Sequence, residues 1–190
     1  MTKHVSDRRE VLLNAATALF REHGYNKTTV RQLAQQSGIK SGSIFHHFDT
    51  KEEILYAIIE RVAIALRDIM KERLLSARTT EEEIFTLIRT SLEFAFEDPQ
   101  IADAYSVSYR DFQYLSEEHK KSIGEYNTEY RLLLTDIMIR AKKEGVITND
   151  PNVLFHFMNG AITHSPKWFR PDGPLNIDQL ADELHKIAVK

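Results

Sequence analysis

The sequence predicts an all-α fold of about nine helices. Apolar residues recur every three to four positions along nearly the whole chain, and no stretch sustains the alternation typical of strands. Helix-capping signals punctuate this pattern, while three of the five prolines gather in one segment, "HSPKWFRPDGPL", at residues 164–175. With 190 residues and 42% hydrophobic composition, the chain is long enough to bury one or two small cores.

Three short helices are expected first. An apolar stripe over residues 11–20 predicts a helix that ends at Gly24, a residue type common just beyond a helix C-terminus. Thr29 followed by Gln32 forms a capping box for a second helix, which ends at Ser37-Gly38. Ser41 is expected to cap a third short helix that continues through Phe48.

Longer and more amphipathic helices are expected afterwards. Threonine followed three residues later by glutamate marks two starts, and Asp-Pro marks two more, because proline suits the first helical turn. The expected starts are Thr50, Thr80, Asp98, Ser116, Asp150 and Asn176. The change in helix length places a domain boundary near residue 49, which gives domains of 1–49 and 50–190. Since the fourth helix starts directly at this boundary, we expect the domains to be mechanically coupled.

The amino-acid composition excludes several classes of protein. Cysteine is absent, which excludes a disulfide framework, a thiolate zinc site and a cysteine nucleophile. No apolar run approaches the roughly 20 residues of a membrane span, and the N-terminus lacks the apolar core of a secretion signal. We therefore expect a cytoplasmic protein.

Charge is unevenly distributed along the chain. The first 51 residues carry eight Lys/Arg and four Asp/Glu, a net +4, whereas the rest carries 17 and 24, a net −7. A basic end on an acidic body favours a polyanionic partner for that end. Chance clustering explains the charges alone equally well.

Residues 28–48 have the spacing of a helix-turn-helix, whose second helix enters the DNA major groove. A generic helix corner gives the same pattern, but the basic bias and small polar residues favour the DNA reading. The stretch "FREHGYNKTTVRQLAQQSGIKSGSIFHHFDTKEEIL", residues 20–55, resembles the DNA-binding signature of TetR/AcrR-type transcriptional regulators. The chain length and the helix count agree with that family. The resemblance implies a homodimeric repressor that binds a palindromic DNA operator and responds to a small-molecule effector, without a cofactor or metal.

The resemblance assigns DNA contacts by position. Ser41, Gly42 and Ser43 match positions that approach base edges, and Arg31 matches one that reaches a guanine in some members. Positions that hold phosphate correspond to Thr29, His46, His47 and Lys51, and the recognition segment also includes Lys40 and Phe45.

One residue departs from the family pattern. The family usually has tyrosine where this chain has Phe45, so the hydroxyl-to-phosphate hydrogen bond is lost and packing or sugar contact is expected. His46 is a candidate to compensate.

The adjacent histidines do not suit a metal. Consecutive helical residues point about 100° apart, so His46 and His47 make poor co-ligands. Phosphate contact is the preferred interpretation, and plain solvent exposure is the alternative.

Aromatic residues in the second domain predict the effector site. Tyrosine combines an apolar body with a polar tip, which suits a mostly hydrophobic pocket. The family's effector lies among the fourth to seventh helices, and the candidates there are Phe94, Tyr105, Tyr109, Arg110, Tyr126 and Tyr130. For any single one, core packing is the alternative. Residues 168–184 resemble a subgroup that senses acyl-CoA thioesters, whose phosphates would meet Arg89, Arg110 and Arg140. Flat aromatics, drugs and metabolites remain open as effectors.

The last two helices carry wide apolar stripes that need partners. A symmetric helix-pair interface in a homodimer is the family's usual solution. Its expected members are Phe157, Met158, Ala161, Ile162, Trp168, Leu180 and Leu184. In the monomeric alternative, both stripes cover the core of their own chain.

Two further functions compete with DNA binding. A small all-α enzyme would use His156 and His164, but no G-x-S-x-G, H-E-x-x-H or glycine-rich phosphate loop is present. We therefore expect no catalytic residues. An adaptor that binds protein instead of DNA would not need Arg31 or Lys51. For the regulator, we hypothesise that the effector tilts the fourth helix and changes the separation of two DNA-reading heads.

Overall fold

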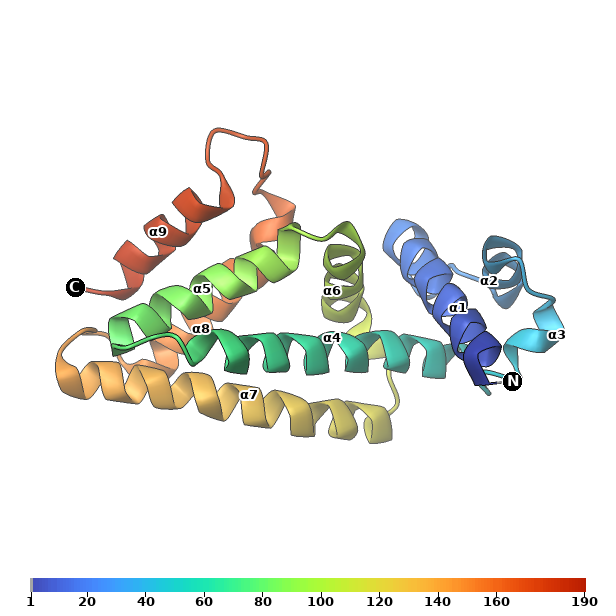
Figure 1. Cartoon of the computed structure of the whole chain (residues 1–190), viewed down its shortest axis with the longest axis horizontal. Helices are drawn as coiled ribbons and strands as arrows, with labels where there is room; N and C mark the ends of the chain where they lie inside the picture. The colour runs from blue at the N-terminus through green and yellow to red at the C-terminus, as the bar shows by residue number, and fades with distance from the viewer. Residues whose placement is uncertain (1) are drawn as a thin grey trace. The chain divides into compact units, whose positions relative to one another are not determined.

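The computed structural model describes residues 2–190, with side chains from Arg8 onward. Figure 1 shows helices joined mostly by short connections, with a longer loop before α9, and the described residues contain no strand, which confirms the all-α prediction. The elements are α1 (Thr2–His23), α2 (Val30–Ser37), α3 (Ser41–Ile44), α4 (Lys51–Leu74), α5 (Thr80–Phe96), α6 (Pro99–Asp111), η1 (Phe112–Tyr114), α7 (Glu117–Glu144), α8 (Pro151–His164), η2 (Ser165–Lys167) and α9 (Ile177–Ala188).

Several predicted caps are present. Thr29 accepts a hydrogen bond from the Gln32 amide while the Gln32 side chain accepts one from the Thr29 amide, which completes the capping box of α2. Asn176 and Gln179 form the same arrangement at α9. Asp150 caps α8, whose first residue is proline. These helices begin where the sequence predicts because local side chains satisfy the free amides of the first turn.

The predicted end of one helix and the predicted cap of another were wrong. The third helix ends at Ile44, and the chain continues as turns to Phe48, so α3 is much shorter than predicted. The N-cap of α5 is Thr79, which accepts a hydrogen bond from the Glu82 amide. Thr80, the predicted cap, instead donates its hydroxyl to Glu144 at 2.5 Å. Two adjacent threonines precede the acidic run, and the one that caps the helix is Thr79, while Thr80 has a long-range partner.

The chain divides into two compact units. Unit 1 comprises the residues up to Ala63 together with Pro99–Ile123, and unit 2 comprises Ile64–Asp98 and Gly124–Lys190. The division falls inside α4 and inside α7, so the chain passes between the units three times. Unit 1 is therefore larger than the predicted DNA-binding domain of residues 1–49, because α6 and the first half of α4 belong to it.

The core of unit 1 draws on segments that are distant in sequence. Leu12, Phe20, Leu33 and Ile44 from the first three helices pack with Ile54 and Leu55 of α4, all almost fully buried. The same cluster is completed by Val107 of α6, by Leu115 directly after η1, and by Ile123 of α7. The three N-terminal helices therefore rest on α4 and α6, and do not form a core by themselves.

The core of unit 2 is a layered helix packing. Met70 of α4 and Ile84, Ile88 and Leu92 of α5 pack with the buried faces of α7, α8 and α9. In Figure 1 the second half of α4 runs beside α7, and Lys71 of α4 pairs with Glu129 of α7. None of the helices described is long and apolar enough to cross a membrane.

Candidate nucleic-acid interface

The α2–α3 pair forms a tight helix-turn-helix within unit 1. Gly38 adopts φ +67°, a left-handed conformation that costs glycine little and other residues more. The Ile39 amide returns to the Ala34 carbonyl at 3.0 Å, which closes the end of α2. Leu33, Ala34 and Ile44 are buried at the crossing. The inner sides of both helices are thus fixed, while their outer sides remain exposed.

The predicted base-reading residues lie on that outer side. Ser41 and Gly42 are exposed and Ser43 is half-buried at the start of α3. Arg31 on α2 and Lys40 before α3 are both exposed, so their cations are accessible to a polyanion. Small residues on a short exposed helix allow close approach to base edges, and flanking cations suit phosphate.

Phe45 is half-exposed, with half of its surface open, whereas Phe48 is buried. Phe48 therefore supplies the packing, and the Arg9 guanidinium lies 4.7 Å above its ring. Phe45 offers an aromatic face at the same surface as exposed His46, and His47 beside it is half-buried. Among the described residues, no group of three or more His, Asp or Glu could hold a metal ion.

Lys51 has a defined structural role. Its ammonium group donates to the carbonyls of Tyr25 and Thr28, both at 2.9 Å, and lies 4.1 Å from the Tyr25 ring centroid. Burial lowers the pKa of Lys51. Two of its three donors thus hold the loop before α2, and the predicted phosphate contact stays a prediction. Thr29, which follows this loop, is exposed and caps α2.

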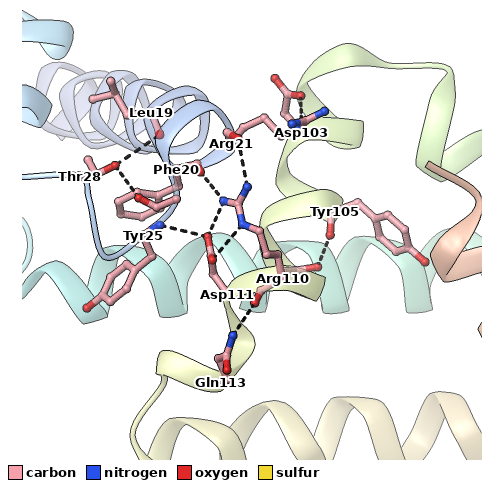
Figure 2. Close-up of polar contacts among 12 residues, drawn as sticks. Leu19, Phe20, Arg21, Tyr25, Thr28, Asp103, Tyr105, Arg110, Asp111 and Gln113 are labelled. Atoms are coloured by element: carbon pink, nitrogen blue, oxygen red, sulfur yellow. Dashed lines mark hydrogen bonds and ion pairs between the residues drawn. The ribbon is translucent and has the colours of Figure 1, made fainter. Parts of the chain in front are cut away.

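Arg110 does not lie free for an effector. Figure 2 shows its guanidinium directed at the end of α1, where it donates to the carbonyls of Phe20 and, at 3.1 Å, of Arg21. Its neighbour Asp111 is buried and accepts hydrogen bonds from Arg110 and from the Tyr25 amide. The hydrogen bond with Asp111 raises the pKa of Arg110.

The other candidate effector residues are divided between the units. Tyr105 and Tyr109 lie on α6 in unit 1, where their rings are 6.3 Å apart; Tyr105 is buried and Tyr109 is half-exposed. Phe94, Tyr126 and Tyr130 belong to unit 2. Burial raises the pKa of Tyr130 to about 12, partly opposed by its hydrogen bond with Ser91. The predicted effector site stays a prediction.

All three arginines proposed for acyl-CoA phosphates already have carboxylate partners. Arg89 contacts Glu93 at 2.9 Å and Asp178 at 3.0 Å, and Arg140 contacts Glu83 at 2.8 Å and Asp136 at 2.9 Å. Arg110 has Asp111 at 2.7 Å. A phosphate would have to displace these partners.

A cavity of about 520 Å³ lies in unit 2, apart from the predicted effector residues. It is lined by Ser76, Ala77, Thr79, Glu81, Glu82, Phe85, Thr86 and His185. None of these residues was predicted from sequence to bind an effector.

The predicted dimer residues fall into two groups. Met158, Ile162, Leu180 and Leu184 are buried in the core of unit 2, as the monomeric alternative expects. Phe157 and Trp168 are more than half exposed, while Ala161 is half-buried. Val153 and Ile187 lie on the same apolar stripes but were not among the predicted interface residues, and they are exposed to a similar degree on α8 and α9. The exposed apolar surface of these helices therefore matches the predicted interface residues only in part.

Sequence reasoning also missed a polar contact between α4 and α7. Glu52 accepts hydrogen bonds from the Ser116 amide and from His119 at 2.7 Å, and the His119 ring stacks on Tyr56. Burial alone would raise the pKa of Glu52, but the hydrogen bonds outweigh it and the pKa is lowered. These partners are more than 60 residues apart, and no local pattern signals them.

A helix-turn-helix with an exposed second helix and accessible cations, carried on an all-α body, defines a DNA-binding transcriptional regulator. Comparison with known families agrees. The family described as "Bacterial regulatory proteins, tetR family" matches residues 12–58, and "Tetracyclin repressor-like, C-terminal domain" matches residues 77–190. The chain belongs to the tetR family of bacterial regulatory proteins.

Individual proteins resemble the chain over nearly its whole length. The HTH-type transcriptional repressor KstR2 of Rhodococcus jostii is 31% identical over 99% of this chain and 92% of its own length. The solved structure of the superantigen PfiT is 34% identical, covers 96% of both chains and has a TM-score of 0.80. The structure of AibR with isovaleryl coenzyme A and operator DNA has a TM-score of 0.87 over 95% of this chain and 97% of its own. At 22% identity, AibR shares the fold.

Proposed function

We propose that the protein is a ligand-responsive transcriptional repressor that binds a palindromic operator as a homodimer and is released by a largely hydrophobic effector. The observation that carries this proposal is the α3 surface. Ser41 and Gly42 are exposed immediately beyond the Gly38 turn, while buried Leu33 and Ile44 fix the helix beneath them. This arrangement presents a rigid reading surface, which base recognition in the major groove requires.

The homodimer is supported by apolar surface in unit 2. Val153, Phe157, Trp168 and Ile187 each expose more than half of their surface. A second copy of the chain is the partner the family resemblance implies, and a two-fold axis would match a palindromic operator. A regulator of this kind acts where the DNA lies, so we infer a cytoplasmic location.

The effector class rests on Tyr105, Tyr109 and the other aromatic candidates, which suit an apolar ligand with a few polar groups. The resemblance of residues 168–184 to acyl-CoA-sensing relatives makes an acyl-CoA thioester the first class to test. The AibR complex contains isovaleryl coenzyme A, which is a practical first probe.

The decisive experiment selects duplexes from a random pool with the purified chain and measures their affinity. We expect enrichment of a palindrome, with affinity that falls steeply as salt rises, because phosphate contacts release counterions. Ser41→Glu should weaken binding by about tenfold or more through repulsion of the DNA backbone. Ser76→Glu, an exposed serine in unit 2, is the matched control and should bind within about twofold of wild type.

The bound duplex is then titrated with isovaleryl coenzyme A, octanoyl coenzyme A and free coenzyme A. Release by the acylated forms alone would support the thioester class. Failure of the wild-type chain to enrich any duplex sequence would sink the repressor proposal itself.

A further inference from the structure

The C-terminal end of α1 is closed by a side chain from α6. The last carbonyls of a helix have no partner within the helix. Arg110 donates to two of them, those of Phe20 and Arg21, as Figure 2 shows, and the Phe20 carbonyl also accepts the Gly24 amide at 2.8 Å. A cation at this end also interacts favourably with the helix dipole. The two helices are far apart in sequence, so this contact fixes a long-range relation inside unit 1.

Asp111 extends the contact to the loop that follows α1. Its carboxylate accepts from the Arg110 Nε at 3.0 Å, from an Arg110 terminal nitrogen at 2.7 Å, and from the Tyr25 amide at 3.3 Å. Asp111 is almost fully buried. Loss of the Arg110 cation would leave this buried carboxylate without its compensating charge. The last two residues of α6 therefore hold both the end of α1 and the start of the loop.

The loop passes this constraint on to α2. The Tyr25 ring stacks on Tyr114 of η1 with ring centroids 5.5 Å apart, and its carbonyl accepts from Lys51. Lys51 also binds the carbonyl of Thr28, the residue before the N-cap of α2. The Thr28 hydroxyl in turn bonds to the Gly24 carbonyl at 2.9 Å. An unbroken set of contacts thus runs from Arg110 and Asp111 to the first residue of the helix-turn-helix.

We propose that Arg110 and Asp111, the α6 clamp, are positioning residues that hold the helix-turn-helix in its DNA-reading geometry and pass changes in α6 to it. The proposal rests on the proposed DNA-binding function. It assigns α6 a direct route to α1 and α2, separate from the expected tilt of α4.

The clamp lies on the same helix as two of the candidate effector residues. Tyr105 and Tyr109, two candidate effector residues, lie on the same helix as Arg110, and Tyr109 is its immediate neighbour. One helical residue advances about 1.5 Å, so Tyr105 lies about two turns or less from the clamp. An effector that shifts α6 by contact with these tyrosines would disturb the carbonyl contacts of Arg110 first.

The test compares Arg110→Gln and Arg110→Lys with Arg21→Gln. Arg21 pairs with Asp103 at 3.4 Å between the same two helices, but both side chains are about half exposed, so it is the matched control. Affinity is measured for the duplex that the wild-type chain enriches. We expect Arg110→Gln to bind about tenfold more weakly, within the range usual for coupled sites. Lysine cannot form the guanidinium fork, so the affinity of Arg110→Lys should lie between that of the wild type and that of Arg110→Gln. The affinity of Arg21→Gln should stay within about twofold of wild type.

Amide hydrogen exchange separates positioning from general instability. For Arg110→Lys, we expect faster exchange across residues 24–29 while α9 in unit 2 exchanges as in wild type. Wild-type affinity in both Arg110 variants would overturn the clamp, as would equal loss of protection in both units. If the wild-type chain enriches no duplex, the proposed function has failed and the clamp has no DNA-reading role.

Discussion

The two units of the molecule hold their helices in different ways. Unit 1 fixes its turns with long polar side chains that reach backbone carbonyls, as Lys51 does at Tyr25 and Thr28 and Arg110 does at α1. Unit 2 joins helices through apolar faces and through ion pairs between side chains, such as Arg140 with Glu83. Its side-chain contacts to carbonyls are local, because Lys142 and Arg170 reach carbonyls no more than six residues away. The carbonyl contacts of unit 1 instead join backbone segments that are distant in sequence.

The largest expected effect tests whether the units are energetically separate. Phe20→Ala removes a fully buried ring from the core of unit 1 and should lower the free energy of unfolding by about 3–5 kcal/mol. Leu75→Ala, at an 86% exposed position, should cost almost nothing. Hydrogen exchange then shows where the loss falls. Faster exchange in α2 with unchanged α9 would support separate units, whereas a matching loss in α9 would show that the chain unfolds as one.

A smaller effect tests the carbonyl contacts. Lys51→Met keeps the length of the side chain but removes two charge-assisted hydrogen bonds, and should cost about 1–3 kcal/mol in urea unfolding. Lys186→Met removes an exposed pair with Glu183 on α9 and should leave the free energy of unfolding nearly unchanged. An equal loss of unfolding free energy in the two variants would show that the carbonyl contacts of Lys51 stabilise the fold no more than an exposed ion pair does.

A further effect appears only in alkali and belongs to unit 2. The pKa of Tyr130 is about 12 in the folded chain, above its ordinary value of 10.0. The neutral phenol therefore contributes stability that is complete below pH 10 and is lost as the pH rises toward 12. Tyr130→Phe cannot ionise, so its free energy of unfolding should fall less between pH 10 and 12 than that of wild type. Parallel pH profiles in urea titrations would show that Tyr130 does not contribute.

The sequence predicted the helices well because their signals are local. The capping box at Thr29 and the Asp150-Pro151 start involve residues within four positions of each other, and both are present. The end of α3 was wrong because Ser41, Ile44 and Phe48 have helical spacing even though the chain turns after Ile44. The start of α5 at Thr80 was correct, but its cap is Thr79, and the hydroxyl of Thr80 goes to Glu144, a partner 64 residues away.

The candidate site shows the same limit. The exposed positions at Ser41 and Gly42 follow from the helix-turn-helix pattern, which is local. The role of Arg110 does not follow from any local pattern, because a lone arginine beside aromatic residues suits an effector pocket as well as a helix end. Its carbonyl partners carry no side-chain signature and lie about 90 positions earlier. Asp111 was missed for the same reason, since its buried partner is a backbone amide.

The passage of the chain between the units has a consequence for building chimaeras. Grafting residues 1–49 onto another regulator would transfer the reading surface without Ile54, Val107 or Ile123, which complete its hydrophobic core. The recipient would have to supply matching side chains at three places distant in sequence. An exchange that also carries residues 50–63 and 99–123 would keep that core and the α6 clamp intact. A graft intended to carry operator specificity should therefore move all of these separate segments together.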